Sequence, residues 1–372
     1  MINIFDVTRA EKEIESQLDA AIKEVRTTGG YCRNFALIGK FETAFAQFCG
    51  KKYAVGVNSG SDALFFALLA YGIGKNDEVI TVSHSFMESS ASISKVGATP
   101  VFVDIGEDFN IDVTKIEAEI NKNTRAILPV HLYGQAADME ALANLAKKHN
   151  LILIEDCCQA HGATFKGKKV PIGETGCFSF YPTKNLGALG DAGAVVTDNE
   201  KVAEKIKSLR DDGRSKDAGY LHNEIGYNSR MDGIQAAALI AKLPSLDKWN
   251  AERKRIAKLY DENLKGVVEI PKENANNSHI YYLYVIKVPR REELINFLKE
   301  NGVGSAVHYP LPIHLQPPYK NLDYEGKLPV TEKIAKEILS LPIYPGLKDE
   351  EVIKVCTKIK EFYKKWKLML VW

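Results

Sequence analysis

Seven short apolar segments in the first two-thirds of the chain constrain its fold more than any other feature. They are rich in Val, Ile and Leu and show no regular alternation with polar residues, which is typical of strands buried on both faces. Helical patterns, such as the one over residues 138–150, separate several of them. We therefore expect an α/β fold with a mostly parallel seven-stranded sheet between helices. The predicted strands cover residues 52–57, 77–82, 99–105, 124–134, 151–156, 176–182 and 193–198.

The pattern changes after about residue 235. A long helical segment is interrupted near Pro244. A strand pattern over residues 280–288, a shorter helix, a Pro-rich segment and a C-terminal helix follow. A proline inside a helix removes a backbone hydrogen bond and so marks a break. This order predicts a smaller α+β domain after the first one. We expect a large domain over residues 1–245 and a small domain over residues 246–372.

The charge balance gives no support to nucleic-acid or membrane binding. The 372 residues include 49 basic and 48 acidic residues, and no basic stripe stands out. No run reaches the roughly 18 apolar residues of a membrane span, and the N-terminus lacks the apolar core of a signal peptide. Six cysteines occur without a CxxC pair. These features predict a reduced, cytoplasmic protein.

One lysine, Lys184, lies between the end of a predicted strand and a loop that contains Gly187 and Gly190. A lysine amine acts as a nucleophile by forming an imine with a carbonyl, and in pyridoxal-phosphate enzymes that carbonyl is the cofactor aldehyde. Most lysines are simply exposed on the surface. The case for Lys184 therefore rests on whether the chain also offers the other groups that such a cofactor needs.

Asp156 is the first of these groups. It ends the apolar segment 151–156, and the carboxyl ends of parallel strands are where α/β sheets bind ligands. A carboxylate there could hold the protonated ring nitrogen of the cofactor. Taken alone, Asp156 is better explained by a helix N-cap or a structural salt bridge.

Three further groups complete the set. Ser59, Gly60 and Ser61 join a strand to a helix, where backbone N–H groups and hydroxyls could hold a phosphate; an ordinary serine N-cap is the alternative. Phe86 could stack on a ring or lie in the core. Ser179 could add a phosphate hydroxyl, although strand alternation would also place a serine there.

A zinc site is the alternative reading of His131, His161, Cys157 and Cys158. Their spacing fits no standard site, and carboxylate and amide neighbours suit a cofactor pocket better. We expect no metal.

The ordered motifs "VNSGSDAL", "ILIEDCCQAHGA", "GCFSFYPTKNLGALGDAGAVVT", "YNSRMDGIQAA" and "VHYPLPIHLQPPY" resemble those of the DegT/StrS-type nucleotide-sugar aminotransferases, which have the fold type I of pyridoxal-phosphate transferases. The resemblance implies that Lys184 is the Schiff-base lysine and moves the proton. It implies that Asp156 pairs with the pyridine nitrogen and that Gln159 reaches the phenolic oxygen. Phe86 would stack on the ring, and the loop glycines would let the lysine swing. The implied phosphate ligands are Ser59, Gly60, Ser61, Ser179 and, from the neighbouring subunit of a homodimer with shared active sites, Asn228.

Subfamily features of the resemblance concern the substrate. Ser229 stands where many 4-aminotransferases carry an aromatic residue, so the chain is closest to the sugar 3-aminotransferases. The implied reaction moves an amino group from L-glutamate to the C3 ketone of a dTDP-linked 3-keto-6-deoxyhexose. His308, Tyr309 and His314 would help to shape the sugar pocket. Amination of a 4-keto nucleotide sugar, or of a smaller phosphorylated ketone, is the alternative.

Three segments depart from the family pattern. Asn34 stands near a usual glycine, Met87 and Glu88 replace small or neutral residues, and Asp212 replaces an aromatic residue. Glu88 is either a substrate contact or a solvated helix residue. Two other classes also stay open. A sugar 3-dehydratase of the same fold would carry histidine in place of Lys184, and a regulator that kept the fold would not bind the cofactor productively.

Overall fold

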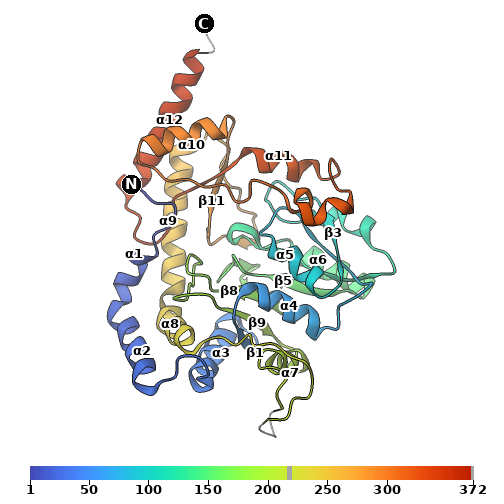
Figure 1. Cartoon of the computed structure of the whole chain (residues 1–372). Coiled ribbons are helices and arrows are strands. Elements are labelled where there is room, and N and C mark those ends of the chain that lie inside the picture. Colours follow the sequence, from blue (N-terminus) through green and yellow to red (C-terminus); the bar gives the residue numbers. More distant parts are fainter. Residues whose placement is uncertain (216–219, 370–372) are drawn as a thin grey trace.

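The computed structural model describes residues 1–215 and 220–369, with side chains up to residue 365 (Figure 1). A seven-stranded sheet lies at its centre, with the strand order β1-β9-β8-β5-β4-β2-β3. The β2–β3, β2–β4, β4–β5 and β5–β8 pairs are parallel, and β9 is antiparallel to both of its neighbours. The mostly parallel sheet is thereby confirmed. The strands are β1 (Tyr53–Val57), β2 (Glu78–Val82), β3 (Thr99–Val103), β4 (Thr124–Ile127), β5 (Ile152–Asp156), β8 (Thr175–Ser179) and β9 (Gly193–Thr197).

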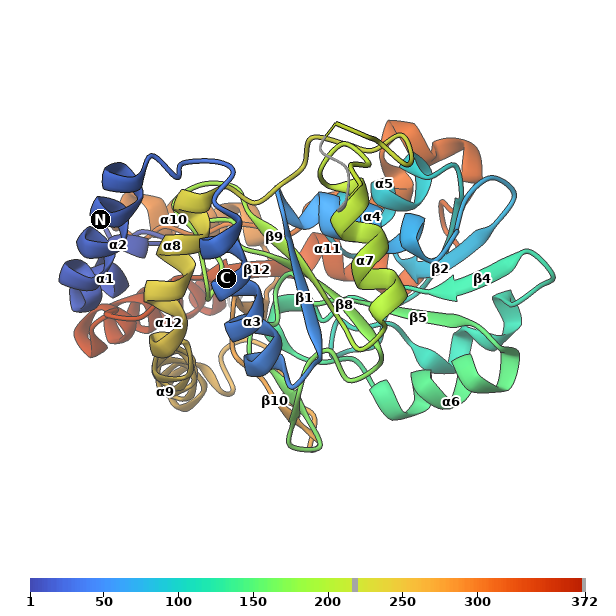
Figure 2. The same ribbon diagram turned by 90° about the horizontal axis from the view of Figure 1, so that it is seen from below.

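Helices cover both faces of this sheet (Figure 2). Strand β8 illustrates this arrangement. Phe178 packs edge-on against Phe45 of α3, with ring centroids 5.0 Å apart. The neighbouring Cys177 donates a hydrogen bond through Sγ to the Ala63 carbonyl of α4. Alternate side chains of one strand thus contact helices on opposite sides. The helices of this part are α1 (Val7–Glu11), α2 (Glu15–Thr28), α3 (Phe35–Cys49), α4 (Gly60–Ala70), α5 (Glu88–Lys95), α6 (Met139–His149), α7 (Glu200–Leu209) and α8 (Gly233–Lys242).

A second, smaller core is built from the C-terminal part of the chain. The predicted break at Pro244 is a short 3-10 helix, η5 (Leu243–Ser245), between α8 and α9. The strands β11 and β12 pair antiparallel. Helix α12 packs in this core, and its C-terminal end projects beyond it (Figure 1). The elements are α9 (Leu246–Leu264), β11 (Tyr284–Lys287), α10 (Arg291–Glu300), α11 (Pro329–Glu337), β12 (Ile338–Leu341) and α12 (Asp349–Met369). A small sheet pairs β6 (Thr164–Phe165) and β7 (Lys168–Lys169) of the first part with β10 (Asn277–Ser278) of the second.

The division into a large domain (residues 1–245) and a small domain (residues 246–372) stays a proposal. The N-terminal residues modify it. The second core begins within α9 at Ile256 and includes Ile2 from the N-terminus, which bridges to Val303. The first few residues therefore pack with the C-terminal part. Among the described residues, no helix combines the length and the apolar character needed to cross a membrane.

Two predicted strands are shorter than expected. The pattern over residues 124–134 gives only β4, because Pro129 has no N–H for the ladder, and the chain then turns into the 3-10 helix η4 (Leu132–Gly134). The pattern over residues 280–288 gives only β11. The residues before β11 instead bond to the η4 turn, through Ile280 N to Gly134 O and Leu283 N to Tyr133 O.

Buried histidines give the fold a pH dependence that can be tested. Burial lowers the pKa of His84 and of His308 to about 4, and that of His161 and of His279 to about 3. In the unfolded chain these groups take up protons below pH 6.5, whereas the folded protein must keep them neutral. The stabilisation is therefore complete above pH 6.5 and is lost as the pH falls towards the folded values.

We expect the free energy of unfolding to fall by about 1 kcal/mol per buried histidine between pH 7 and pH 5.5. Urea unfolding at the two pH values measures this, in a range where most carboxylates do not yet titrate. His161 is the best single test, because neither ring nitrogen has a hydrogen-bond partner among the described residues. His161→Leu should reduce the pH dependence relative to wild type, because it removes one of these buried groups. Equal pH slopes in wild type and His161→Leu would contradict the assignment.

Candidate active site

A cavity of about 650 Å³ opens beside the carboxyl end of β5. It collects side chains from segments that are far apart in sequence, including the N-terminal Phe5 and the C-terminal Tyr309. All but two of the predicted site residues line it. Those that do are Ser59, Gly60, Ser61, Phe86, Glu88, Asp156, Gln159, Ser179, Lys184, His308 and Tyr309.

The amino group of Lys184 is available for chemistry. The backbone N–H of Lys184 closes a turn by donating to Tyr181 O at 2.8 Å. Its Nζ lies 4.3 Å from the centre of the Tyr282 ring. Within residues 1–215 and 220–365, the amino group makes no hydrogen bond and no ion pair that would hold it. An aromatic face stabilises a nearby amine without blocking it.

The loop glycine Gly187 has a different role from the expected one. It is buried, and a Cβ there would lie 2.2 Å from Pro182 O. Its carbonyl accepts a hydrogen bond from Lys242, which also pairs with Glu11 of α1. The glycine thus allows close backbone packing, and the interpretation that it gives the lysine freedom to swing is not supported at this position.

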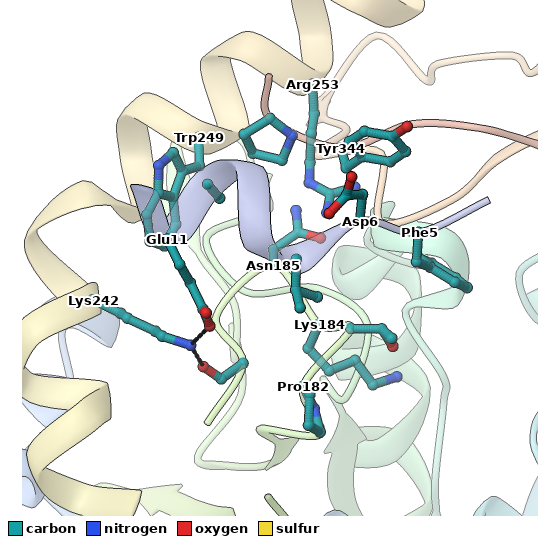
Figure 3. A pocket seen from close by; sticks show the side chains of 15 residues that line it. Phe5, Asp6, Glu11, Pro182, Lys184, Asn185, Lys242, Trp249, Arg253 and Tyr344 are labelled. Carbon is teal, nitrogen blue, oxygen red and sulfur yellow. Dashed lines mark hydrogen bonds and ion pairs between the residues drawn. The ribbon is translucent and has the colours of Figure 1, made fainter. Parts of the chain in front are cut away.

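A second, small cavity of about 40 Å³ adjoins this loop, and Figure 3 shows the side chains that line it. The side chain of Lys184 extends away from Trp249 and Arg253 of α9, whereas Asn185 points towards that helix (Figure 3). The Asn185 amide donates to Asn250 Oδ1 and to Ile280 O. The residue after the lysine therefore fixes the loop to α9, and the lysine itself faces the large cavity.

The Asp156 carboxylate is held from two sides. Its Oδ2 accepts from Ser89 Oγ at 2.8 Å, and its Oδ1 accepts from the backbone N–H of Cys158 at 3.1 Å. Ser85 Oγ lies 2.7 Å from Ser89 Oγ and completes a short chain of hydroxyls. The carboxylate is 4% exposed and lines the cavity without a basic partner among the described residues. A buried carboxylate of this kind is suited to a positively charged ring nitrogen.

The N-terminus of α4 provides a binding place for an anion. Ser59 caps the helix, since its Oγ accepts from the Asp62 N–H at 3.1 Å, and the first N–H groups of a helix have no partner within it. A Cβ at Gly60 would lie 2.5 Å from the Cβ of Ser179 and 3.0 Å from Cys158 Sγ. Only glycine fits there, so backbone and hydroxyl groups approach the cavity closely.

Gln159 and the aromatic residues complete the wall. Gln159 Nε2 donates to Tyr309 Oη at 3.1 Å. The Phe86 ring is 55% exposed and lies 5.9 Å from the Tyr309 ring. An aromatic residue exposed at a cavity, and not buried in the core, is free to cover a flat ligand.

His314 and Asn228 are the two predicted residues that do not line the cavity. His314 is 1% exposed, and its ring is hydrogen-bonded to Ser83 Oγ and Glu332 Oε1, so both nitrogens have structural partners. The structure therefore does not place His314 in the cavity, where a residue of the predicted sugar pocket would lie. Asn228 instead accepts a hydrogen bond from Arg230 through its Oδ1. It is not brought to the cavity of its own chain.

The segments that depart from the family pattern differ in their relation to the site. Glu88 lines the cavity at the start of α5, and its carboxylate pairs with Lys95 at 2.7 Å. Asn34 caps α3, Met87 packs against a small apolar cluster, and Asp212 pairs with Arg230. Of these four residues, only Glu88 is positioned to affect a ligand in its own chain.

One buried group has the composition of a metal site. Ligand atoms of His131, Glu155 and Cys157 lie within 4.8 Å of one another. However, Glu155 already accepts from His131 Nε2 and from the N–H groups of Ile172 and Gly173. His131 Nδ1 accepts from Ala137 N. These hydrogen bonds satisfy His131 and Glu155 without an ion.

Sequence reasoning missed several residues of the site. Ser89 lies four residues after Ser85, and this helical spacing beyond a strand end was a usable signal. Tyr282 and Phe5 gave none: their rings stack at 6.2 Å, and Phe5 also lies 6.1 Å from the His308 ring. Both belong to segments that reach the cavity only through tertiary packing.

The cavity residues fit pyridoxal phosphate. The unbound Lys184 amine, the buried Asp156 carboxylate and the α4 cradle that a Cβ would fill match the aldehyde, ring nitrogen and phosphate of that cofactor. Together with the fold, they define a pyridoxal-phosphate-dependent aminotransferase. The chain belongs to the DegT/DnrJ/EryC1/StrS aminotransferase family, whose sequence pattern matches residues 12–360.

Three similar proteins illustrate this relationship. The chain is 43% identical to the pleiotropic regulatory protein of Geobacillus stearothermophilus, over 98% of this chain and 99% of that protein. It is 42% identical to the dTDP-3-amino-3,4,6-trideoxy-α-D-glucose transaminase of Streptomyces venezuelae, over 97% and 96% of the two chains. The crystal structure of S. venezuelae DesV in complex with a ketimine intermediate superposes with a TM-score of 0.94, at 41% identity over 97% and 98% of the chains.

Proposed function

We propose that this enzyme transfers an amino group from L-glutamate to the C3 ketone of a dTDP-linked 3-keto-6-deoxyhexose. One observation carries the proposal: the Lys184 amine, which has no hydrogen bond or ion pair among the described residues, shares one cavity with Asp156, His308 and Tyr309. The S. venezuelae relative, which is 42% identical, is named as a transaminase at C3 of a dTDP sugar. Its similarity over nearly the whole chain supports the same position of amination.

The cofactor, when bound, supplies an aldehyde for amines and a ring that accepts electrons. We propose that Asp156 keeps a proton on its ring nitrogen and that Gln159 contacts its phenolic oxygen. Phe86 would cover one ring face. Ser59, Gly60, Ser61 and Ser179 would hold the phosphate at the start of α4.

Lys184 would then hold the cofactor and move the proton at the reacting carbon. Its Nζ is not engaged by any carboxylate among the described residues, so the amine is able to accept and return a proton. Burial and the nearby Lys184 lower the pKa of His308 to about 4. His308 is therefore neutral at physiological pH and would serve as a hydrogen-bonding group towards the sugar.

We propose that the active unit is a homodimer with shared sites. Lys184 is the only Lys or Arg among the described residues that line the cavity, whereas both substrates are anionic. In the segment before Asn228, Tyr220 and Ile225 are 91% and 93% exposed, which is unusual for large apolar residues. This segment would pack on a second copy and bring Asn228 to the partner's phosphate site. Six free cysteines support a cytoplasmic location.

A panel of keto sugars with L-glutamate tests the substrate. The purified holoenzyme is incubated with dTDP-3-keto, dTDP-4-keto and UDP-4-keto sugars and with a small phosphorylated ketone, and products are identified by mass spectrometry. We expect the amino product from the dTDP-3-keto sugar at the highest rate. Amination of 4-keto sugars alone would move the reaction to C4, and no amination of any ketone would favour a regulator.

A further inference from the structure

Tyr133 lies directly behind the cavity wall in an unusual backbone conformation. It is 2% exposed, does not line the cavity, and belongs to the η4 turn. Its φ of 58° and ψ of 2° are in the left-handed region. Bulky residues rarely adopt this conformation, and they keep it only where the surrounding contacts require it. Its hydrogen bonds show what those contacts are.

The phenol of Tyr133 connects the large part of the chain to the His308 backbone. Tyr133 Oη is in contact with His308 O and lies 2.8 Å from His84 Nε2. A carbonyl can only accept, so the phenol donates its proton to His308. His84 Nε2 must then donate to the phenol oxygen, which it can do as a neutral imidazole. This arrangement satisfies both groups of the buried phenol.

The backbone N–H of Tyr133 fixes a second group of the site. It donates to Gln159 Oε1 at 2.9 Å, which leaves Gln159 Nε2 to donate to Tyr309 Oη at 3.1 Å. One residue thus holds His308 through its side chain and Tyr309 through Gln159. Both held residues line the cavity, and they come from the C-terminal part of the chain.

We propose that Tyr133 is a positioning residue that sets the place of the His308–Tyr309 pair against the cofactor side of the cavity. Substrate-facing groups need to be held within a fraction of an ångström, and locked hydrogen bonds behind them provide this. Among the described residues, the other hydrogen bond of His308 joins its Nδ1 to Ser340 Oγ at 2.9 Å, on the C-terminal side. The hydrogen bond from the Tyr133 phenol therefore connects His308 to the cofactor-binding part of the chain. The substrate part of this inference rests on the proposed function.

Tyr133→Phe removes the phenol hydroxyl and keeps the backbone N–H to Gln159. In the holoenzyme, we expect amide hydrogen exchange to accelerate in peptides that cover residues 305–312. The KM for the keto substrate should rise about tenfold, with a smaller change in kcat. The absorbance spectrum of the bound cofactor should stay unchanged, because Gln159 keeps its backbone partner.

Tyr260→Phe is the matched control. Tyr260 is fully buried and its phenol also donates to a backbone carbonyl, Pro342 O at 2.9 Å, but it does not line the cavity. It should leave both the exchange of residues 305–312 and the KM unchanged. The inference is overturned if Tyr133→Phe changes neither quantity, or if Tyr260→Phe changes both to the same extent.

Two further measurements keep the inference testable. If Tyr133→Phe does not fold, His84→Asn removes the N–H donated to the same phenol, and an unchanged exchange rate of residues 305–312 would then overturn the inference. The exchange measurement needs no substrate. If no 3-keto sugar is aminated, the proposed substrate fails, while accelerated exchange still supports the positioning role and unchanged exchange still overturns it.

Discussion

Lys184→Arg is expected to lower the rate of amino transfer by about a thousandfold or more while the protein stays folded. The guanidinium of arginine remains protonated, so it cannot attack an aldehyde or accept a proton from carbon. Lys184 makes no hydrogen bond or ion pair through Nζ within the described residues, and its Nζ lies 4.3 Å from the centre of the Tyr282 ring. The loss of this amine should therefore cost chemistry and little stability. Steady-state rates and thermal unfolding, measured on the same preparation, separate the two.

A second readout locates the cofactor on the chain. After borohydride reduction of the wild-type holoenzyme, mass spectrometry of the peptides should find the cofactor on Lys184, and no labelled peptide should appear for Lys184→Arg. Lys168→Arg is the control, because Lys168 is exposed and lies outside the cavity. Full activity of Lys184→Arg, or label on another lysine, would show that the assignment is wrong.

The sheet was predictable because its strands carry their own signal. Segments such as 151–156 are apolar on both faces only where helices cover both sides of a sheet, so their sequence implies their surroundings. Pro129 shows where this signal fails. It lies inside an apolar run and removes a ladder hydrogen bond, and the chain beyond it forms the η4 turn instead of continuing β4.

The site was predictable where its residues follow strand ends or helix starts. Asp156 and Ser59 occupy such positions, and both line the cavity. His314 was predicted from its motif, yet the chain turns after Pro312 into a 3-10 helix, and both the backbone and the ring of His314 bond to Ser83. A sequence motif indicates which segment lies near the site. The direction in which a side chain of that segment points depends on tertiary contacts such as those of His314 with Ser83.

Residues that reach the site from remote segments had no local signal. Phe5 arrives there because Ile2 packs into the C-terminal core, and Tyr282 because its segment bonds to the η4 turn. Gly187 illustrates the converse. A glycine in a loop suggests flexibility, but here the carbonyl of Pro182 occupies the space that a side chain would need.

Asp156→Asn should have the second largest effect, a loss of about a hundredfold to a thousandfold in kcat/KM. The asparagine has nearly the same shape. Its oxygen can still accept from the Cys158 N–H, and its NH2 group can donate to Ser89 Oγ, so the fold should not change. It lacks the negative charge that would hold a proton on the cofactor ring nitrogen. Because no basic partner of Asp156 occurs among the described residues, no other interaction should be lost. The absorbance spectrum of the holoenzyme should shift together with the rate.

Ser89→Ala provides a graded comparison, because it leaves the charge and removes one of the two hydrogen bonds that orient it. We expect the activity to fall about tenfold. The Asp156 carboxylate keeps its charge, so its interaction with the ring nitrogen weakens but is not lost. The order of activity should be wild type, Ser89→Ala and then Asp156→Asn. If Asp156→Asn were as active as wild type, the carboxylate would serve only to cap the Cys158 N–H, and the ring nitrogen would need another partner. A Ser89→Ala protein less active than Asp156→Asn would instead mean that the hydroxyl acts on the substrate directly and that the position of Asp156 is not what Ser89 controls.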